Sequence, residues 1–364
     1  FFFQAEDGIR DVERSRGIGD VYKRQVNVGI IGAGFMGGMH AEVYNNLPNA
    51  RVLAIADIDP EKCQMLASKY SNVEALTDPE KLFSREDIDT VDICLPTFLH
   101  KSYCIKAARA GKNIFCEKPI TLSLEDADEI IGEVDKAGVK FMVGHVIRFW
   151  PEYVRLKEIV DSNKLGKLIS ITCTRLSPSP TWDWERWLTD SERSGGALVD
   201  LHIHDVDYLL YLLGTPVSLY SRLSNSPFAY GHVFTTFNFP DGVVGIAEGG
   251  WDMPDNFPFT MSFNALFEKG CVEFNNRFEK TLAIYEKGKK EVEYPKMDVE
   301  FQATADTGGN IANLGGYFSE LKYFVNCIEK GEFPTLADGK VAREALRIVL
   351  LERDSINSGK IVYL

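Results

Sequence analysis

The feature that most constrains the fold of this chain is the glycine-rich segment Gly32–Gly37, which reads GAGFMG. A short apolar run, Val26–Ile31, precedes it, and a segment of helical character, Phe35–Leu47, follows it. A second apolar run, Arg51–Ala56, then closes on Asp57, twenty residues after the last glycine of the motif. A strand, a glycine turn, a helix and a second strand ending in an acid form the unit that binds dinucleotides. We therefore expect a doubly wound parallel sheet, the Rossmann fold, in this part of the chain.

Each residue of the motif has an expected role toward a dinucleotide. Gly32 permits the tight turn, Gly34 lets the backbone approach a pyrophosphate, and Gly37 lets the helix pack closely on the strand. Phe35 and Met36 open the helix, whose first N–H groups would hold the pyrophosphate. The alternative is a glycine turn in an unrelated α/β fold, which the flanking strands and the following acid disfavour.

Asp57 is the residue expected to select the cofactor. Its carboxylate would accept hydrogen bonds from the hydroxyls of the adenosine ribose and would repel a 2′-phosphate. The next residue, Ile58, offers no positive charge that could compensate. We therefore expect NAD as the cofactor in preference to NADP.

Short apolar runs continue to alternate with helical segments up to about residue 146. Strands and helices at this interval predict right-handed crossovers and a parallel sheet. Ser123-x-x-Asp126 is a capping box that opens one of the helices, and Gly138 ends that helix. The sequence thus predicts an NAD-binding Rossmann domain over residues 26–146. Its further strands are expected at Thr90–Leu95, Asn113–Cys116 and Lys140–Val146.

Residues 147–364 have a different texture and predict a substrate-binding and oligomerisation domain. Strands follow one another without regular helices between them, and turn signals such as Pro240-Asp241-Gly242 separate them. This pattern predicts an α+β domain with a largely antiparallel sheet. Strands are expected at Leu168–Arg175, Val217–Leu223, His232–Phe239, Val243–Trp251, Phe259–Asn264 and Cys271–Phe274, and late helices at Tyr317–Lys330 and Lys340–Asn357.

Two polar motifs follow strands of the predicted parallel sheet, at the carboxyl ends where such sheets bind ligands. Pro96, Thr97 and His100 come after one strand and are expected to line the cofactor site; the alternative is a helix cap with a surface histidine. Glu117 and Lys118 come after the next strand. We expect Glu117 to contact the cofactor and Lys118 to carry a proton beside it. An exposed loop lysine is the alternative reading.

The segment Gly195–Leu213 predicts a helix with an apolar face and a second, polar stripe. Asp200, His204, Asp207 and Tyr211 share that stripe by their spacing. Such groups at the edge of a core are costly unless they serve a cleft, which makes Asp200 and His204 catalytic candidates. A metal site is a rival, but two histidines that lie two positions apart diverge on a helix, and we expect no metal. The other alternative is that His204 has a structural role, as a hydrogen-bonded histidine on the flank of the helix.

Two further residues are candidates for contact with the substrate. Arg148 follows the last strand of the predicted parallel sheet, and Trp187 lies in an aromatic loop that also holds Trp182, Trp184 and Arg186. Aromatic rings with an arginine suit stacking on a sugar and hydrogen bonding to it. They could equally pack an interface between domains.

Residues Phe1–Gln25 differ in style from the rest of the chain. Gln4–Asp11 (QAEDGIRD) and Asp20–Gln25 (DVYKRQ) back-translate into end sequences used in sequencing libraries. We expect this segment to be non-native, disordered and dispensable, with a natural disordered tail as the alternative. It carries as many acidic as basic residues, so the net charge belongs to the remainder.

Composition bounds the partners of the protein. The chain has 53 acidic and 40 basic residues, a net charge of −13, and no basic run, which argues against nucleic acid and anionic membranes. No apolar run approaches the roughly eighteen residues of a membrane span. Seven cysteines without a C-x-x-C pair suit reduced thiols. We expect a cytoplasmic protein with a small-molecule partner.

These motifs together make the chain resemble the Gfo/Idh/MocA oxidoreductases, which include glucose–fructose oxidoreductase and inositol dehydrogenase. The resemblance covers Val26 to Leu364. Its markers are GAGFMGGMH (Gly32–His40), PTFLH (Pro96–His100), EKP (Glu117–Pro119), SGGALVDLHIHDVD (Ser194–Asp207) and the closing helix Lys340–Asn357.

By this resemblance Lys118, Asp200 and His204 match the family's catalytic lysine, aspartate and histidine. The implied reaction is hydride transfer between a CH–OH group of a sugar or cyclic polyol and NAD. His204 would act as general base, Asp200 would orient that imidazole, and Lys118 would steady the alkoxide or relay the proton. An NAD-dependent glycoside hydrolase and a non-catalytic NAD-binding sensor are the alternatives.

The predicted antiparallel sheet also bears on assembly. If helices cover only one of its faces, the other face needs a partner for burial. The family resemblance likewise implies dimers or tetramers, and we expect a homodimer or homotetramer.

Overall fold

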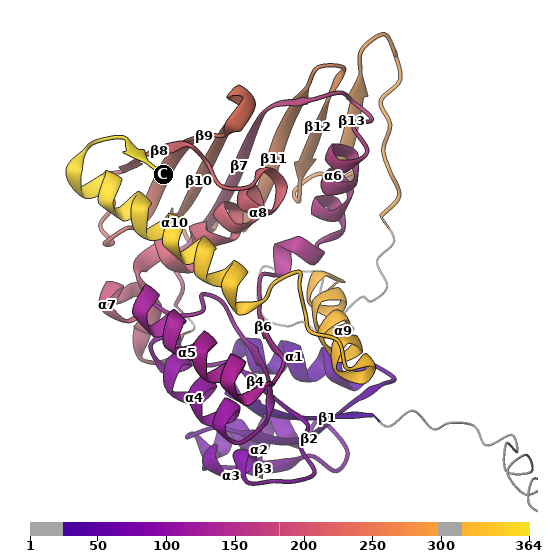
Figure 1. Ribbon diagram of the computed structural model, residues 1–364, viewed down its shortest axis with the longest axis vertical. Helices are drawn as coiled ribbons and strands as arrows, with labels where there is room; N and C mark the ends of the chain where they lie inside the picture. The colour runs from indigo at the N-terminus through magenta and orange to yellow at the C-terminus, as the bar shows by residue number, and fades with distance from the viewer. Residues whose placement is uncertain (1–24, 182, 298–314) are drawn as a thin grey trace, which may run out of the picture.

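The computed structural model describes residues 25–181, 183–297 and 315–364. Figure 1 shows two sheets, one above the other, with helices packed between and around them. The segment expected to be non-native, residues 1–25, lies outside the described residues apart from Gln25, and so does Trp182. The predictions on that segment therefore stay predictions.

Within residues 25–181 the first sheet has six strands, all parallel, in the order β3-β2-β1-β4-β5-β6. The order reverses beside β1, which is the switch point of a doubly wound sheet. The predicted Rossmann architecture is thereby confirmed. The strands are β1 (Val26–Ile31), β2 (Ala50–Ala56), β3 (Glu74–Leu76), β4 (Thr90–Ile93), β5 (Asn113–Cys116) and β6 (Phe141–Val143). The helices are α1 (Phe35–Asn46), α2 (Pro60–Ala67), α3 (Glu80–Phe83), α4 (Thr97–Arg109) and α5 (Leu124–Ala137).

Local sequence explains the elements of this first half. Helices cover both faces of the sheet, which is why its central strands are continuous apolar runs; Ile30 and Ile93 are fully buried. Helix α5 begins where the Ser123 hydroxyl accepts a hydrogen bond from the Asp126 N–H at 3.2 Å. It ends at Gly138, which adopts a left-handed φ of 67°. Both helix boundaries agree with the predicted capping box and glycine stop.

Among the described residues from 168 onward, eight strands form the second sheet, in the order β13-β12-β11-β7-β10-β9-β8-β14. Neighbouring strands are antiparallel except β7 and β10, which run parallel. The prediction of a largely antiparallel sheet is confirmed. The strands are β7 (Leu168–Pro178), β8 (Ser218–Leu223), β9 (His232–Asn238), β10 (Val244–Met253), β11 (Thr260–Phe267), β12 (Gly270–Asn275), β13 (Leu282–Glu286) and β14 (Val362–Tyr363).

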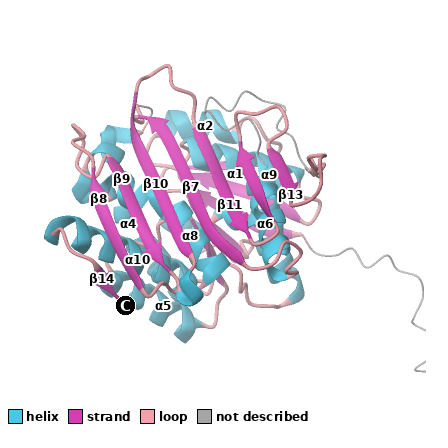
Figure 2. Ribbon diagram, turned by 90° about the horizontal axis from the view of Figure 1, so that it is seen from above, coloured by secondary structure: helices cyan, strands magenta, loops and turns pink. Residues whose placement is uncertain are grey.

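Helices lie against one face of the second sheet, and the other face is bare in the view of Figure 2. Residues alternate along each strand, so that every second side chain points to the bare face. Large apolar side chains there are strongly exposed: Ile169 is 45%, Phe234 43% and Leu266 44% exposed. The helices and helical turns of this half are η1 (Val146–Phe149), α6 (Pro151–Asp161), η2 (Trp184–Thr189), α7 (Ser191–Ser194), η3 (Leu198–His202), α8 (Ile203–Leu213), η4 (Pro240–Gly242), α9 (Gly315–Lys330) and α10 (Gly339–Ser358).

The two late helices, α9 and α10, join the halves of the molecule. Helix α9 packs on α1, and its Phe324 ring lies 5.6 Å from the Phe115 ring of β5. Helix α10 packs on α8 and on α5. The strands of the two sheets thus separate near residue 146, whereas the late helices contact both halves, and the exact domain boundary stays a prediction. None of the described helices is both long and apolar enough to cross a bilayer.

The predicted helix Gly195–Leu213 is wrong in its first third. Gly195 and Gly196 both adopt left-handed conformations, with φ of 77° and 71°, which an α-helix does not allow. A π turn, η3, follows over Leu198–His202, and the regular helix α8 begins only at Ile203. The short strands β3, β13 and β14 were not predicted, because two to five residues carry too little periodicity.

Candidate cofactor and catalytic site

The glycine turn between β1 and α1 leaves room for a pyrophosphate. Gly32 has a φ of +105°, and a Cβ there would lie 2.3 Å from the Cys94 carbonyl oxygen. A Cβ on Gly37 would lie 1.8 Å from the oxygen of Gly32, so both glycines are required by close backbone packing. A Cβ on Gly34, in contrast, would meet no protein atom within 4 Å. Open space above Gly34, at the N-terminus of α1, fits a pyrophosphate group.

Asp57 lies beside this turn, at the carboxyl end of β2. Its Oδ2 accepts a hydrogen bond from the Ala33 N–H at 2.6 Å, and its Oδ1 accepts one from the Asp59 N–H at 2.8 Å. The carboxylate is thus held at the edge of the glycine turn, while Phe35 and Met36 are half-buried at the start of α1. The arrangement fits the ribose and pyrophosphate of a dinucleotide.

His100 was expected either to line the cofactor site or to lie on the surface, and its observed environment is buried. Helix α4 begins at Thr97 after Pro96, but the His100 ring is fully buried. Its Nδ1 and Nε2 each lie 2.8 Å from a carbonyl oxygen, those of Pro119 and Leu95. Burial lowers the pKa of His100, which leaves one ring nitrogen to donate. The surface-histidine alternative is therefore wrong: His100 ties the β4–α4 loop to the Lys118–Pro119 loop, and a contact between His100 and the cofactor stays a prediction.

The structure brings Lys118 and Asp200 together across 82 positions of sequence. Lys118 follows β5 and donates from Nζ to the backbone oxygen of Asp200 at 2.7 Å and to its Oδ1 at 3.0 Å. Both side chains retain 14% exposure, so this ion pair lies at the edge of the core. A strand end of the first sheet and a turn of the second half therefore meet at one point.

His204 lies near this pair, on the first turn of α8. Burial lowers its pKa well below the ordinary value, and the positive charges of Lys118 and Arg175 lower it further. Nδ1 is buried and has no hydrogen-bond partner among the described residues. The lowered pKa favours the unprotonated imidazole, the form that a general base requires.

The relation expected between Asp200 and His204 needs correction. On a regular helix, spacing by four residues would stack the two side chains. The π turn replaces that helix at Asp200, and the described contacts of its carboxylate go to Lys118. Asp200 therefore positions the lysine; no described contact shows it orienting the imidazole.

Arg148 is held by contacts within the protein. It is buried, and its Nε and Nη2 donate to the two carboxylate oxygens of Asp207 at 2.7 and 2.8 Å. Its Nη1 donates to the Leu336 carbonyl at 2.7 Å, and its guanidinium lies 4.5 Å from the Tyr211 ring centroid. Arg148 therefore links η1, α8 and the segment before α10, and a contact between Arg148 and the substrate stays a prediction.

The aromatic loop of η2 lies over α4 of the first half. Arg193 stacks on the rings of Phe98 and Trp184, at 4.6 and 5.5 Å from their centroids. Trp187 is half-buried against a small apolar cluster that includes Leu188 and Trp251. The structure thus supports the interface reading of this loop, and direct contact between Trp187 and a substrate stays a prediction.

Two buried side-chain pairs that hold η3 and α8, one an ion pair and one a histidine–carboxyl hydrogen bond, were missed in the sequence. Arg175 of β7 donates from Nε to Asp205 at 2.8 Å, and Glu352 of α10 lies 3.0 Å from His202 Nε2. With Arg148–Asp207, they fix η3 and α8 from three directions. Isolated charged residues in the sequence gave no signal, because the partners are 30 and 150 positions apart.

A third missed group lies under the cofactor turn. His40 of α1 and Asp92 of β4 are joined by a hydrogen bond of 2.8 Å, and the Cys94 thiol donates to Asp92 at 3.3 Å. Ligand atoms of these three residues lie within 4.8 Å of one another, as in a metal site. Burial, however, raises the pKa of the Cys94 thiol well above its ordinary value, which favours hydrogen bonding over metal ligation. The expectation that no metal is bound stays a prediction.

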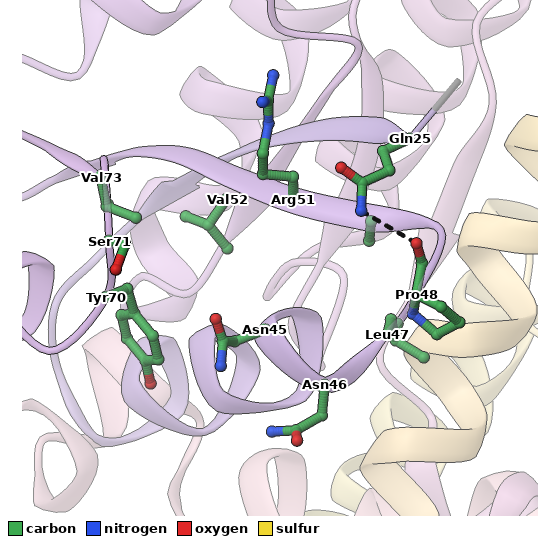
Figure 3. Close-up of a pocket in the computed structure, with 11 residues that line it drawn as sticks. Gln25, Asn45, Asn46, Leu47, Pro48, Arg51, Val52, Tyr70, Ser71 and Val73 are labelled. Carbon is green, nitrogen blue, oxygen red and sulfur yellow. Dashed lines mark hydrogen bonds between the residues drawn. The ribbon is translucent and has the colours of Figure 1, made fainter. Parts of the chain in front are cut away.

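A cavity of about 330 Å³ lies away from these residues. Asn45, Asn46 and Pro48 line it with Arg51 and Tyr70, and Gln25 Nε2 donates to the Pro48 carbonyl across its rim (Figure 3). Apart from Arg51, the second residue of β2, these residues precede β1, β2 or β3, so the cavity is at the amino edge of the sheet. Ligands of doubly wound sheets bind at the opposite, carboxyl edge.

Comparison with known proteins agrees with this geometry. Residues 26–145 match the family described as "Oxidoreductase family, NAD-binding Rossmann fold", and residues 153–273 match the GFO/IDH/MocA C-terminal domain. A scyllo-inositol 2-dehydrogenase (NAD(+)) of Bacillus subtilis is 29% identical over 327 residues, which cover 87% of this chain and 90% of that protein.

Two other relatives show the range of the group. A 2,7-anhydro-N-acetylneuraminate hydratase of Mediterraneibacter gnavus is 35% identical over 194 residues, which cover 52% of this chain and 50% of that protein. An oxidoreductase from Agrobacterium radiobacter, solved with NAD+, L-tartaric acid and magnesium, shares the fold at a TM-score of 0.82 and 18% identity. That likeness covers 93% of this chain and 98% of the other.

The glycine turn with Asp57, the meeting of Lys118 with Asp200, and the two matching domains lead to one conclusion. The chain belongs to the GFO/IDH/MocA family of oxidoreductases and binds NAD through a Rossmann fold.

Proposed function

We propose that this protein oxidises a CH–OH group of a sugar or cyclic polyol, with NAD preferred to NADP as the acceptor. The observation that carries the proposal is the convergence of Lys118, Asp200 and His204 at the carboxyl end of β5. The relation to an inositol dehydrogenase over 87% of the chain supports the class of substrate.

Bound NAD would supply the acceptor for the hydride; the protein itself supplies position and proton transfer. His204 takes the hydroxyl proton, and we assign this step to Nε2 because Nδ1 is enclosed. Lys118 Nζ holds the substrate oxygen as negative charge develops on it. Asp200 fixes the ammonium group through two contacts, at 2.7 and 3.0 Å.

The preference for NAD rests on Asp57 and Ile58. The Asp57 carboxylate is pinned beside the glycine turn by two backbone N–H groups. A 2′-phosphate there would face a negative charge with no cation from Ile58, which is 65% exposed. Repulsion of like charges disfavours NADP.

A second candidate function is a reaction in which oxidation is only transient, as in a hydratase or an NAD-dependent glycoside hydrolase. The relative named a hydratase, 35% identical over half of this chain, favours keeping it. The same lysine and histidine would serve both reactions. A non-catalytic sensor is disfavoured, since a sensor needs no convergence of three titratable groups.

A screen of inositols, free sugars and glycosides with NAD, followed by NADH fluorescence and by product analysis, separates these functions. A dehydrogenase forms NADH in proportion to oxidised product. A transient oxidation gives product without net NADH. Neither NADH nor product with any of them would count against the proposal.

We also propose that the bare face of the second sheet mediates self-association into a homodimer or homotetramer. Ile169, Phe234 and Leu266 expose apolar surface on that face, and contiguous exposed apolar patches mark interfaces. A cytoplasmic location is proposed as well, because all seven cysteines are free thiols.

A further inference from the structure

A row of three buried titratable groups runs beneath the catalytic lysine, and the reaction as described does not use it. His40 Nδ1 lies 2.8 Å from Asp92 Oδ2, and His40 Nε2 lies 3.1 Å from Glu117 Oε1. Asp92 and His40 are fully buried, and Glu117 is 6% exposed. The three residues come from α1, β4 and the end of β5. Charged groups are expensive to bury, so an apolar core would serve the fold equally well.

The row carries more negative than positive charge. Burial alone would lower the pKa of His40, but Asp92 and then Cys94 together outweigh burial, and the pKa lies well above its ordinary value. Burial alone would raise the pKa of Glu117, but His40 and then Lys118 bring it below its ordinary value. One imidazolium therefore stands between two carboxylates.

Neighbouring cations do not neutralise the surplus. Among the described residues, Lys118 is paired with Asp200, Arg148 with Asp207, and Arg175 with Asp205. One carboxylate of the row thus remains without a cation of its own. Glu117 is the member at the carboxyl edge of the sheet, next in sequence to Lys118, where a doubly wound sheet binds its ligand.

A fourth acid, Glu320 of α9, provides a contrast. It is fully buried, and neither of its carboxyl oxygens has a hydrogen-bond partner among the described residues. Burial and then the nearby charge of Glu117 raise its pKa well above the ordinary value. Glu320 is thus a neutral acid, and it adds no charge to the row.

We propose that the Asp92–His40–Glu117 row sets the charge beneath the nicotinamide, so that the protein holds oxidised NAD+ more tightly relative to NADH. The nicotinamide ring is a cation in NAD+ and neutral in NADH, so a surplus carboxylate attracts only the oxidised form. The row therefore favours NAD+ when the two forms compete for the same site. The proposal needs NAD binding but no assignment of the substrate.

The test compares dissociation constants for NAD+, NADH and ADP-ribose, measured by calorimetry and NADH fluorescence, in the wild type and two matched variants. Glu117→Gln removes the surplus charge and should raise the ratio Kd(NAD+)/Kd(NADH) by about tenfold, the low end of what one nearby charge does. Kd for ADP-ribose, which lacks the nicotinamide, should stay within about twofold of the wild type. Glu320→Gln makes the same chemical change on a neutral acid and should leave the ratio unchanged.

Two results would overturn the proposal: an unchanged ratio in folded Glu117→Gln, or an equal shift in Glu320→Gln. If Glu117→Gln does not fold, the wild type decides the question. The wild type gives a test without substitution. It should bind NAD+ at least as tightly as NADH, and a tenfold preference for NADH would contradict the charge assignment.

Discussion

The two halves of the protein contribute different kinds of groups to the site. The first half offers mainly backbone: glycines that allow close approach and a helix start that faces open space above Gly34. The second half offers side chains, Asp200 and His204, held on a π turn and a helix by buried ion pairs. Lys118 is the one catalytic candidate from the first half, and it reaches across to Asp200. The comparison teaches that binding and chemistry should be separable by mutation.

The largest effect is expected from the side-chain half and its lysine. Lys118→Met should lower kcat by about 10²–10³-fold while NAD still binds, because the cation that holds the developing negative oxygen is lost and the glycine turn is untouched. Asp200→Asn should cost less, since it loosens the ammonium group without removing it. Steady-state kinetics with a calorimetric Kd for NAD check both. A loss of NAD affinity equal to the loss of kcat would contradict the claim that cofactor binding and catalysis depend on different halves.

In the first half, adding a single methyl group to a glycine of the turn should weaken NAD binding. Gly34→Ala places a Cβ in open space, so the melting temperature should hardly change, but NAD should bind at least about tenfold more weakly. Gly37→Ala places a Cβ 1.8 Å from the Gly32 oxygen and should lower both the melting temperature and the affinity. Thermal unfolding and calorimetry on the pair provide the measurement. Unchanged NAD affinity in Gly34→Ala would show that the pyrophosphate does not approach this glycine.

Cofactor choice should shift by a similar or smaller factor. Asp57→Ser with Ile58→Arg removes a repulsive carboxylate and adds a cation, so the ratio of NADP to NAD affinities should rise about tenfold or more. The single change Ile58→Arg is the control and should give only part of the shift. Tighter binding of NADP than NAD by the unmodified protein would refute the role of Asp57.

The smallest expected effect is a displacement of the pH profile. His204 acts as a base only when unprotonated, so oxidation is lost as pH falls through its pKa. Because that pKa is lowered, kcat/KM for oxidation should stay high below about pH 6.5. In Lys118→Met, one of the charges that lowers the pKa is gone, and the acidic limb of the residual activity should move to higher pH. A limb at the same pH in both proteins would mean that another group titrates.

Local patterns predicted the backbone half, whereas contacts distant in sequence decided the other. The glycine turn, Asp57 and the capping box of α5 depend on residues within one βαβ unit, and they were found where expected. Arg148–Asp207 and His40–Asp92 join residues 59 and 52 positions apart, so no local pattern in the sequence reveals either pair. The π turn at Asp200 follows from two left-handed glycines, which helical periodicity does not register.

Turnover and NAD affinity measured on one preparation of His204→Ala test the central claim most directly. The account predicts a kcat lower by about 10²–10⁴-fold with a Kd for NAD within about twofold of the wild type. Combining it with Lys118→Met should lower kcat by less than the product of the two single effects, since both groups act on the same hydroxyl in one step. Near wild-type turnover in His204→Ala, or loss of NAD binding in step with turnover, would contradict the account.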